Sequence, residues 1–338
     1  TKSKKFLTNN YININLKNTK SKLKSTTNEY ANKLIKELNN KNFSIVEIHN
    51  RPQLLSKISN KVKSRFIFYF HNDPISMKGS KTRKERLNIL KSVEKLVFVS
   101  DWVRERFFVD IDQKLKTKTE IVYPSVNKQS IVNKQKNIIF VGRLNHSKGY
   151  DLFKDAIIRI LDEFPKWNAY SIGNEDRRSI YINHPRHKEL GFITHKETLK
   201  LLNRSEIAVV PSRWEEPFGR SALEASSCGC ATIISSRGGL KETTDSAIIL
   251  KKLDSYNIYL EIKKLIKKNK NRKKYQLKGR QNIKHLISDN TKIIDEIRED
   301  CVPFYNINFI RKKLKIINIY NQGQKLNHRL YNLSLIHI

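Results

Sequence analysis

The sequence is poor in cysteine and has no long apolar run. Its three cysteines, Cys228, Cys230 and Cys301, are an odd number without the paired spacing of a zinc site or a disulfide framework, which indicates a reducing compartment. No apolar run approaches the roughly 20 residues that span a bilayer, and residues 1–5 are not followed by the apolar stretch of a signal peptide. We therefore expect a cytoplasmic protein.

Acidic residues are scarce relative to basic ones. Lys and Arg number 67 against 32 Asp and Glu, a net charge of +35, which suggests an anionic partner such as nucleic acid, an acidic membrane surface or a phosphorylated substrate. Charge alone does not choose among them, and a Lys-rich composition spread over the whole surface is the alternative. Hydrophobic residues make up 38% of the 338 residues, enough for packed cores in two domains.

Short β-branched runs alternate with longer helix-like stretches. The runs are residues 45–48, 66–70, 96–99, 138–141, 170–172, 207–210 and 232–234. This alternation is typical of βαβ units, in which helices cover both faces of a parallel sheet. The predicted fold class is therefore α/β.

The chain changes character near residue 130. Residues 127–137 are polar, carry no periodicity and separate the third run from the fourth, which predicts domains at 1–130 and 131–305. The first domain has no strong strand before residue 45, so we expect its start to be missing. Residues 306–338 are expected to hold the start of a truncated further domain, with a strand near 313–320, and an artefactual tail at 333–338.

Glycines cluster in the second half, where eight of the 11 fall between positions 142 and 239. The most specific segment, residues 138–151, is a predicted buried strand followed by Gly142, Arg143, Lys148 and Gly149, with Asp151 as a candidate cap for the next helix. Two cations at the carboxyl end of a strand, beside a helix N-terminus, form a receptor for a diphosphate. A surface turn with incidental charges is the alternative.

A second segment, residues 209–225, combines a strand, a loop and a helix predicted to begin near Phe218. The backbone N–H groups of Gly219, Arg220 and Ser221 are expected to point at an anion, with Glu216 and Glu224 on either side of it. Carboxylates accept hydrogen bonds from hydroxyls, so the arrangement suits a sugar nucleotide. The plainer alternative is that Glu224 is a solvated carboxylate on the helix and that Glu216 only interacts with the dipole at the helix N-terminus.

Together these motifs occur in an order that resembles the C-terminal domain of the retaining glycosyltransferases of the GT-B fold, family 4 (glycosyl transferases group 1). The resemblance spans about residues 138–250 and rests on Gly-Arg-x4-Lys-Gly, Glu-Pro-Phe-Gly-x4-Glu and the later Arg-Gly-Gly. It implies two Rossmann-like domains facing a cleft, the N-terminal one truncated and on the acceptor side. The C-terminal domain, with its closing helices, binds the nucleotide sugar.

The resemblance also implies roles for single residues. Arg143 and Lys148 hold the donor diphosphate, Glu216 is the first Glu of the family's Glu-x7-Glu motif, close to the transferred sugar, and Glu224 is the second, on the ribose. Ile193 sits where the family contacts the base through its backbone. In the first half, His71 follows a buried strand at the place where such enzymes carry a His facing the donor sugar. His49 ends the preceding strand in the same way and is a candidate on the acceptor side.

The implied function is transfer of a hexose from a nucleotide-diphosphate sugar to a glycan or lipid-linked acceptor with retention, in bacterial cell-surface polysaccharide or lipopolysaccharide synthesis. No metal or other cofactor is expected. Peripheral contact with an anionic membrane is an open expectation, and specific nucleic-acid binding is not expected. The alternatives are a nucleotide-sugar epimerase, which should lack the paired motifs, and a basic nucleic-acid-binding protein, which predicts exposed aromatics among its cations.

Overall fold

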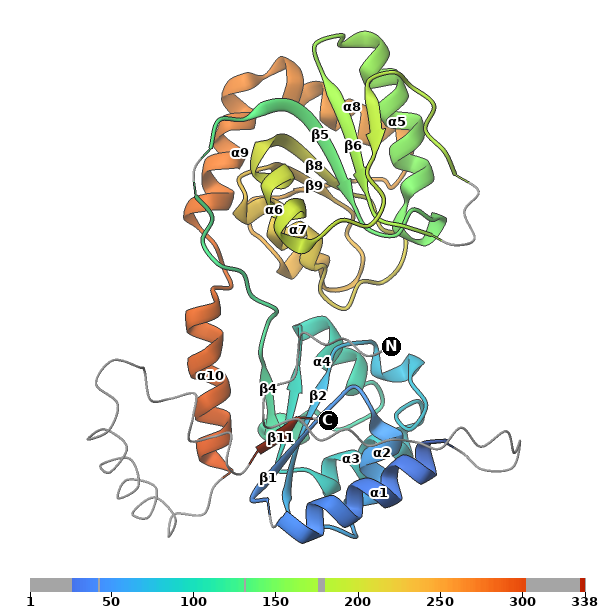
Figure 1. The fold of residues 1–338 in the computed structure, drawn as a ribbon, viewed down its shortest axis with the longest axis vertical. Helices are drawn as coiled ribbons and strands as arrows, with labels where there is room; N and C mark the ends of the chain where they lie inside the picture. The colour runs from blue at the N-terminus through green and yellow to red at the C-terminus, as the bar shows by residue number, and fades with distance from the viewer. Residues whose placement is uncertain (1–25, 42, 131, 176–179, 302–334, 338) are drawn as a thin grey trace, which may run out of the picture. The chain divides into compact units, whose positions relative to one another are not determined.

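The computed structural model describes residues 26–41, 43–130, 132–175, 180–301 and 335–337. They form two compact units (Figure 1). Unit 1 contains the described residues of 1–98, 103–121 and 293–338, and unit 2 contains 99–102 and the described residues of 122–292. Both units are layers of helices on a parallel sheet, so the predicted α/β class is confirmed.

The chain passes between the units at places that differ from the predicted domain limits of 130 and 305. Apart from residues 99–102, which belong to unit 2, it enters unit 2 between Ile121 and Val122 and returns to unit 1 at Ile293. The early entry has a local reason, because Val126 N donates to His285 O (3.1 Å) and Ile287 N donates to Val126 O (3.3 Å). These bonds attach the start of the polar segment to unit 2.

Unit 1 has the strand order β11-β1-β2-β3-β4, with every neighbouring pair parallel. Its strands are β1 (Ile45–His49), β2 (Arg65–Phe70), β3 (Lys95–Phe98), β4 (Thr119–Ile121) and β11 (Leu335–His337). Its helices are α1 (Thr26–Lys41), α2 (Pro52–Ile58), α3 (Arg83–Ser92), the part of α4 (Asp101–Phe107) from Val103 on, and the second half of α10 (Ile287–Asp300). A run of touching aromatic rings in its core joins β2, β3 and α4 through Phe68, Phe70, Phe98 and Phe107.

The C-terminal segment is described only in part. The strand expected near 313–320 and the start of a further domain lie outside the described residues. Leu335–His337, expected to belong to an artefactual tail, pair with Ile45–Glu47 of β1 as strand β11. The expectation about the origin of that tail stays a prediction.

Unit 2 has the parallel strand order β10-β9-β8-β5-β6-β7. Its strands are β5 (Gln135–Val141), β6 (Asn168–Ile172), β7 (His187–Glu189), β8 (Ser205–Val210), β9 (Ala231–Ile234) and β10 (Ile248–Ile249). Its helices are α5 (Tyr150–Glu163), α6 (His195–Arg204), α7 (Arg220–Ser227), α8 (Ser255–Lys267) and α9 (Asn269–Gln281), followed by the first half of α10.

Alternate residues of the unit 2 strands enter two different cores. Ile138 and Phe140 of β5 pack in the core that includes residues of α5 and α8, whereas Ile139 packs in the core that includes residues of α6 and α7 (Figure 1). Successive side chains of a strand point to opposite faces, so a strand covered on both sides is apolar at every position. This explains the unbroken apolar run at residues 138–141.

All seven of the alternating runs form strands, and four short strands of the described residues were not predicted. Besides β11, the missed strands are β4, β7 and β10, which contain two or three residues each. Their sequences Thr-Glu-Ile, His-Lys-Glu and Ile-Ile are too short to show a period.

Candidate functional site

The turn after β5 is held by the side chain of Asn145. Its Oδ1 accepts hydrogen bonds from Lys148 N (3.1 Å) and Ser147 Oγ (2.8 Å), and this closes a short 3₁₀ turn over His146–Lys148. Gly149 then takes a left-handed φ of 70° and caps α5. The prediction that Asp151 caps this helix was wrong, because the helix begins one residue before it at Tyr150 and its carboxylate faces Arg213.

Lys148 and Glu216, predicted from two separate motifs, are in direct contact. Lys148 Nζ lies 2.6 Å from Glu216 Oε1, and it also lies 4.3 Å from the centre of the Trp214 ring. Glu216 is only 7% exposed. A nearly buried carboxylate therefore has one ammonium group as its partner, and the indole face limits where that ammonium can lie.

The loop that carries Trp214 is fastened to the first motif. Arg213 forms two bonds of 2.6 Å with the carboxylate of Asp151, and the backbone N–H groups of Arg213 and Trp214 both donate to Ser147 O. Burial alone raises the pKa of Asp151, but the hydrogen bonds and charge of Arg213 outweigh it and hold this pKa below its ordinary value. The ion pair thus fixes the two motifs against each other at ordinary pH.

A pair of glycines lets a third segment approach the same loop. A Cβ on Gly238 would lie 2.2 Å from Glu216 O, and one on Gly239 would lie 2.5 Å from Pro217 O. Glu215 fastens this segment, since its carboxylate accepts from Gly238 N (2.6 Å) and pairs with Arg237 (2.9 Å). The Arg-Gly-Gly motif therefore supports the backbone on which Glu216 stands.

The helix that follows begins with unpaired backbone donors. Gly219, with φ 102°, caps α7, which starts at Arg220 rather than near Phe218. Within the described part of the chain, the backbone N–H groups of Gly219, Arg220 and Ser221 have no hydrogen-bond partner. Unpaired N–H groups and the positive end of the helix dipole together favour an anion at this end.

Glu224 lies on the next turn and is 6% exposed. Its Oε1 accepts from His195 Nε2 (3.0 Å) and from the side chain of Arg220 (3.2 Å). His195 begins α6, where Thr194 and Glu197 form a reciprocal capping box. Sequence reasoning missed His195, although the Thr-x-x-Glu signature predicts a helix start at that point.

The other two predicted donor residues of unit 2 lie apart from these contacts. Arg143 is exposed and forms no ion pair with any described residue. Ile193 lies just before α6 and packs against the core of β5, β6, β8, α6 and α7. It lines a pocket of about 270 Å³ together with Leu190, Glu197, Lys200, Leu201 and Arg204.

Unit 1 brings its two predicted histidines together. His49 ends β1 and His71 follows β2, and His49 Nδ1 lies 3.0 Å from His71 Nε2, so one ring donates and the other accepts. The rings are nearly parallel, with centres 5.2 Å apart. Desolvation by the surrounding chain lowers the pKa of His71, which favours its neutral form. The neighbouring Asn50, at φ 60°, accepts a hydrogen bond from His71 N (3.1 Å).

The described residues hold no group of three His, Cys, Asp or Glu side chains placed to bind a metal ion. None of their helices combines the length and apolarity needed to cross a membrane.

The two parallel-sheet units have the GT-B fold of glycosyltransferases, which is the fold of the similar solved structures. Residues 124–282 match the family described as "Glycosyl transferases group 1", so the match lies within unit 2.

Two curated relatives come from Bacillus subtilis (strain 168). Spore coat protein SA is 25% identical over 243 residues, 62% of this chain, and the putative glycosyltransferase YtcC is 25% identical over 264 residues, 68% of this chain. The matches span 64% of the length of each relative. Among solved structures, Anabaena Alr3699/HepE in complex with UDP is similar with a TM-score of 0.67 and 16% identity, covering 80% of this chain and 82% of that one.

Proposed function

We propose that this protein is a retaining hexosyltransferase of family 4 that uses a nucleotide-diphosphate sugar as donor and a glycan or lipid-linked hydroxyl as acceptor. The observation that carries the proposal is the contact between Lys148 and the nearly buried Glu216. Their loops meet beside the unpaired N–H groups that begin α7. The UDP complex of the similar Anabaena protein supports a nucleotide donor.

Donor binding is assigned to unit 2. The diphosphate is held by Arg143, Lys148 and the N–H groups of Gly219, Arg220 and Ser221, because these groups supply positive charge and have no carboxylate partner other than Glu216 among the described residues. Glu224 accepts hydrogen bonds from the ribose. The backbone near Ile193 contacts the base.

In the chemical step, the acceptor oxygen forms a bond to the anomeric carbon while the bond from that carbon to the diphosphate oxygen breaks. The departing diphosphate takes the acceptor proton. Lys148 and the start of α7 stabilise the charge that grows on the diphosphate, as preorganised groups that need no rearrangement. Glu216 stabilises the positive charge that develops on the sugar, and His71 contributes a neutral hydrogen-bonding ring on the side of unit 1.

This chemistry requires no metal or other cofactor in the proposal. The cellular role proposed is synthesis of cell-surface polysaccharide or lipopolysaccharide in the cytoplasm of a bacterium. Peripheral contact with anionic lipid is part of the proposal because each Lys or Arg near such a surface contributes about 1 kcal/mol. Sedimentation with anionic vesicles at low salt measures it, and protein that stays in the supernatant would remove this part.

The test of the donor site separates binding from chemistry. Glu224→Ala should weaken UDP binding by about 10- to 150-fold, because it removes a hydrogen bond to a charged group. Glu216→Gln should keep UDP affinity within about twofold and depress kcat, since its charge matters most as the sugar becomes positive. Lys148→Ala should lower both the UDP affinity and kcat, because Lys148 holds the diphosphate before and during its departure. Calorimetry with UDP and turnover of a panel of nucleotide sugars give the two readouts.

Glu261→Ala is the matched control, since it removes the same charge from α8, where Glu261 pairs with Lys264 and with no other residue that the structure describes. Both readouts should be unchanged in it. A Glu216→Gln variant with unchanged kcat, together with a Glu224→Ala variant that lost turnover but kept UDP affinity, would reverse the two roles and end the motif assignment. A wild-type chain that bound no nucleoside diphosphate would end the proposal as a whole.

A further inference from the structure

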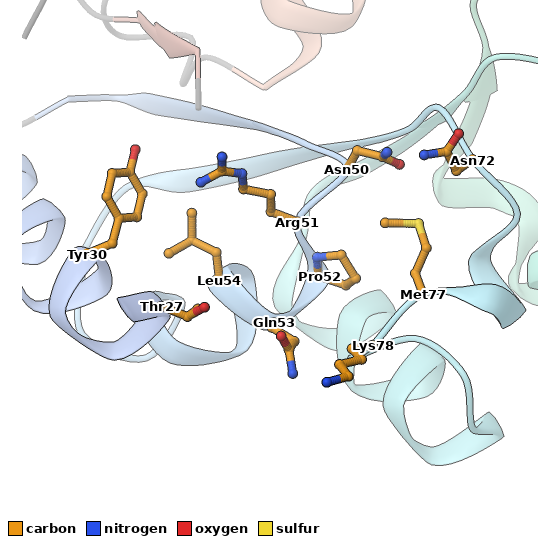
Figure 2. A pocket seen from close by; sticks show the side chains of 10 residues that line it. All are labelled: Thr27, Tyr30, Asn50, Arg51, Pro52, Gln53, Leu54, Asn72, Met77 and Lys78. Carbon is orange, nitrogen blue, oxygen red and sulfur yellow. The ribbon is translucent and has the colours of Figure 1, made fainter. Parts of the chain in front are cut away.

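A pocket of about 740 Å³ lies in unit 1, and its lining includes Asn50 and Asn72, which follow the two histidines in the sequence. Its walls come from α1, from the turn between β1 and α2, and from the segment after β2 (Figure 2). Ten described residues line it: Thr27, Tyr30, Asn50, Arg51, Pro52, Gln53, Leu54, Asn72, Met77 and Lys78. The volume is in the range of pockets that enclose small organic ligands.

The charge of the lining has one sign. Arg51 and Lys78 are cationic, and none of the ten residues is acidic. Neither cation forms an ion pair with any residue that the structure describes. The guanidinium of Arg51 lies 5.6 Å from the centre of the Tyr30 ring, which restricts it beside the pocket without neutralising it. A pocket with two unneutralised cations favours an anionic ligand.

The remaining lining suits a sugar ring. Asn50, Gln53, Asn72 and Thr27 offer amide and hydroxyl groups, which can pair with hydroxyls in either direction, while Pro52, Leu54 and Met77 are apolar. In Figure 2, Tyr30 lies at one side of the pocket and Asn50 and Asn72 at the other. A lining with several amides and few apolar groups favours a polyhydroxylated ligand over a lipid chain.

Several lining residues are sequence neighbours of the two predicted histidines of unit 1. Asn50 and Arg51 directly follow His49, and Asn72 directly follows His71. Asn50 Oδ1 already accepts from His71 N, so the amide NH₂ group of Asn50 is what remains for a ligand. A ligand bound by Asn50 and Asn72 is therefore held one residue along the chain from each histidine, although neither histidine lines the pocket.

We infer that this pocket binds the acceptor, and that the acceptor is a saccharide carrying an acidic group, carboxylate or phosphate, recognised by Arg51 and Lys78. That the ligand of this pocket is the acceptor rests on the proposed transferase function. The choice of an acidic saccharide rests on the lining alone.

The test uses the full chain and pairs of probes that differ only in charge. Ligand-observed NMR titration compares methyl β-D-glucuronide with methyl β-D-glucoside, and glucose 6-phosphate with glucose. Each acidic probe should bind about 10-fold more tightly than its neutral partner, since a charge-assisted hydrogen bond is worth about that factor. Arg51→Gln and Lys78→Gln should each remove most of the difference, and Arg51→Lys should keep more of it than Arg51→Gln.

Lys63→Gln is the matched control, because Lys63 is an exposed lysine of unit 1 that does not line the pocket. An equal loss in Lys63→Gln would overturn the inference in favour of the overall charge of the chain. Equal binding of acidic and neutral probes would also overturn it. Binding to phosphatidylserine vesicles that depended on Arg51, without discrimination between the glycosides, would overturn it in favour of a lipid surface.

The same samples are titrated with UDP, which separates the two proposals. Charge discrimination in the pocket without any UDP binding would leave the acidic-saccharide site standing and overturn the transferase function. UDP binding without charge discrimination would leave the transferase function standing and overturn the acidic-saccharide site. Thermal melting shows whether Arg51→Gln still folds. If it does not, the comparison of acidic and neutral probes is decided by Lys78→Gln, because Lys78 is exposed and its substitution should leave the fold intact.

Discussion

Gly149 shows how closely backbone segments approach one another at the candidate site. Its φ of 70° lies in the left-handed region, and a Cβ there would lie 2.0 Å from Pro211 O. Backbone cannot give way as the end of a flexible side chain can. The turn that carries Lys148 can therefore pack directly against the backbone after β8, because Gly149 has no side chain to separate them.

We expect Gly149→Ala to lower the free energy of unfolding by about 2–4 kcal/mol. Left-handed backbone costs an alanine roughly 1 kcal/mol, and the added clash costs about 1–3 kcal/mol more. Gly191→Ala is the control, because Gly191 has a similar φ of 62° but nothing within 4 Å of its Cβ position. It should lose only about 1 kcal/mol. Urea unfolding measures both, and equal losses would show that the contact with Pro211 is unimportant.

At the scale of elements, the second half of α10 is joined to the sheet of unit 1 by a buried ion pair. Arg298 lies 2.8 Å and 3.0 Å from the two oxygens of Glu47, which is fully buried in β1. Tyr69 of β2 donates to the same carboxylate (3.0 Å), and burial together with the charge of Glu47 raises the pKa of Tyr69, so its hydroxyl stays protonated. One carboxylate thus connects a helix and two strands.

Arg298→Met should lower the free energy of unfolding by about 3–5 kcal/mol, because it leaves the buried Glu47 carboxylate without its cation. Lys292→Met removes a cation from the exposed face of the same helix and should change stability by less than about 0.5 kcal/mol. Urea titration followed by circular dichroism compares them. Similar small losses in the two variants would mean that α10 is held by apolar packing instead.

The whole molecule should lose stability in mildly acidic solution. Burial lowers the pKa of His285, against a smaller raising effect of its hydrogen bond to Glu242 O, and desolvation lowers the pKa of His71. Both folded values lie below the ordinary 6.5, so unfolding takes up protons below that pH. The stabilisation is therefore complete above about pH 6.5 and is lost as the pH falls through the lowered folded values.

Urea midpoints at pH 7.5, 6.5 and 5.5 measure this loss. The range stays above the ordinary pKa of the carboxylates whose values are lowered, Asp151 and Asp254 among them, so these groups contribute little. The double variant His71→Gln/His285→Gln should show a flatter dependence, because Gln keeps a hydrogen-bonding side chain that does not titrate. A wild-type midpoint that did not change over this range would contradict the prediction.

Local sequence determined the elements and most of the candidate site of unit 2. Strands covered on both faces need apolar residues at every position, which made the run at 138–141 recognisable. Glycines at strand ends marked the turns that carry Lys148 and Glu216. These signals are local, because they depend on backbone conformation within a few residues.

Only the tertiary structure decided which side chains meet. The contact of Lys148 with Glu216 joins positions 68 residues apart, that of His195 with Glu224 joins positions 29 apart, and Arg298 reaches Glu47 across 251. The pocket of unit 1 likewise combines α1 with the turn after β1 and the segment after β2. Such contacts follow from the strand order and the helices packed on it, and no local pattern encodes that order because the same βαβ units can be arranged in several ways.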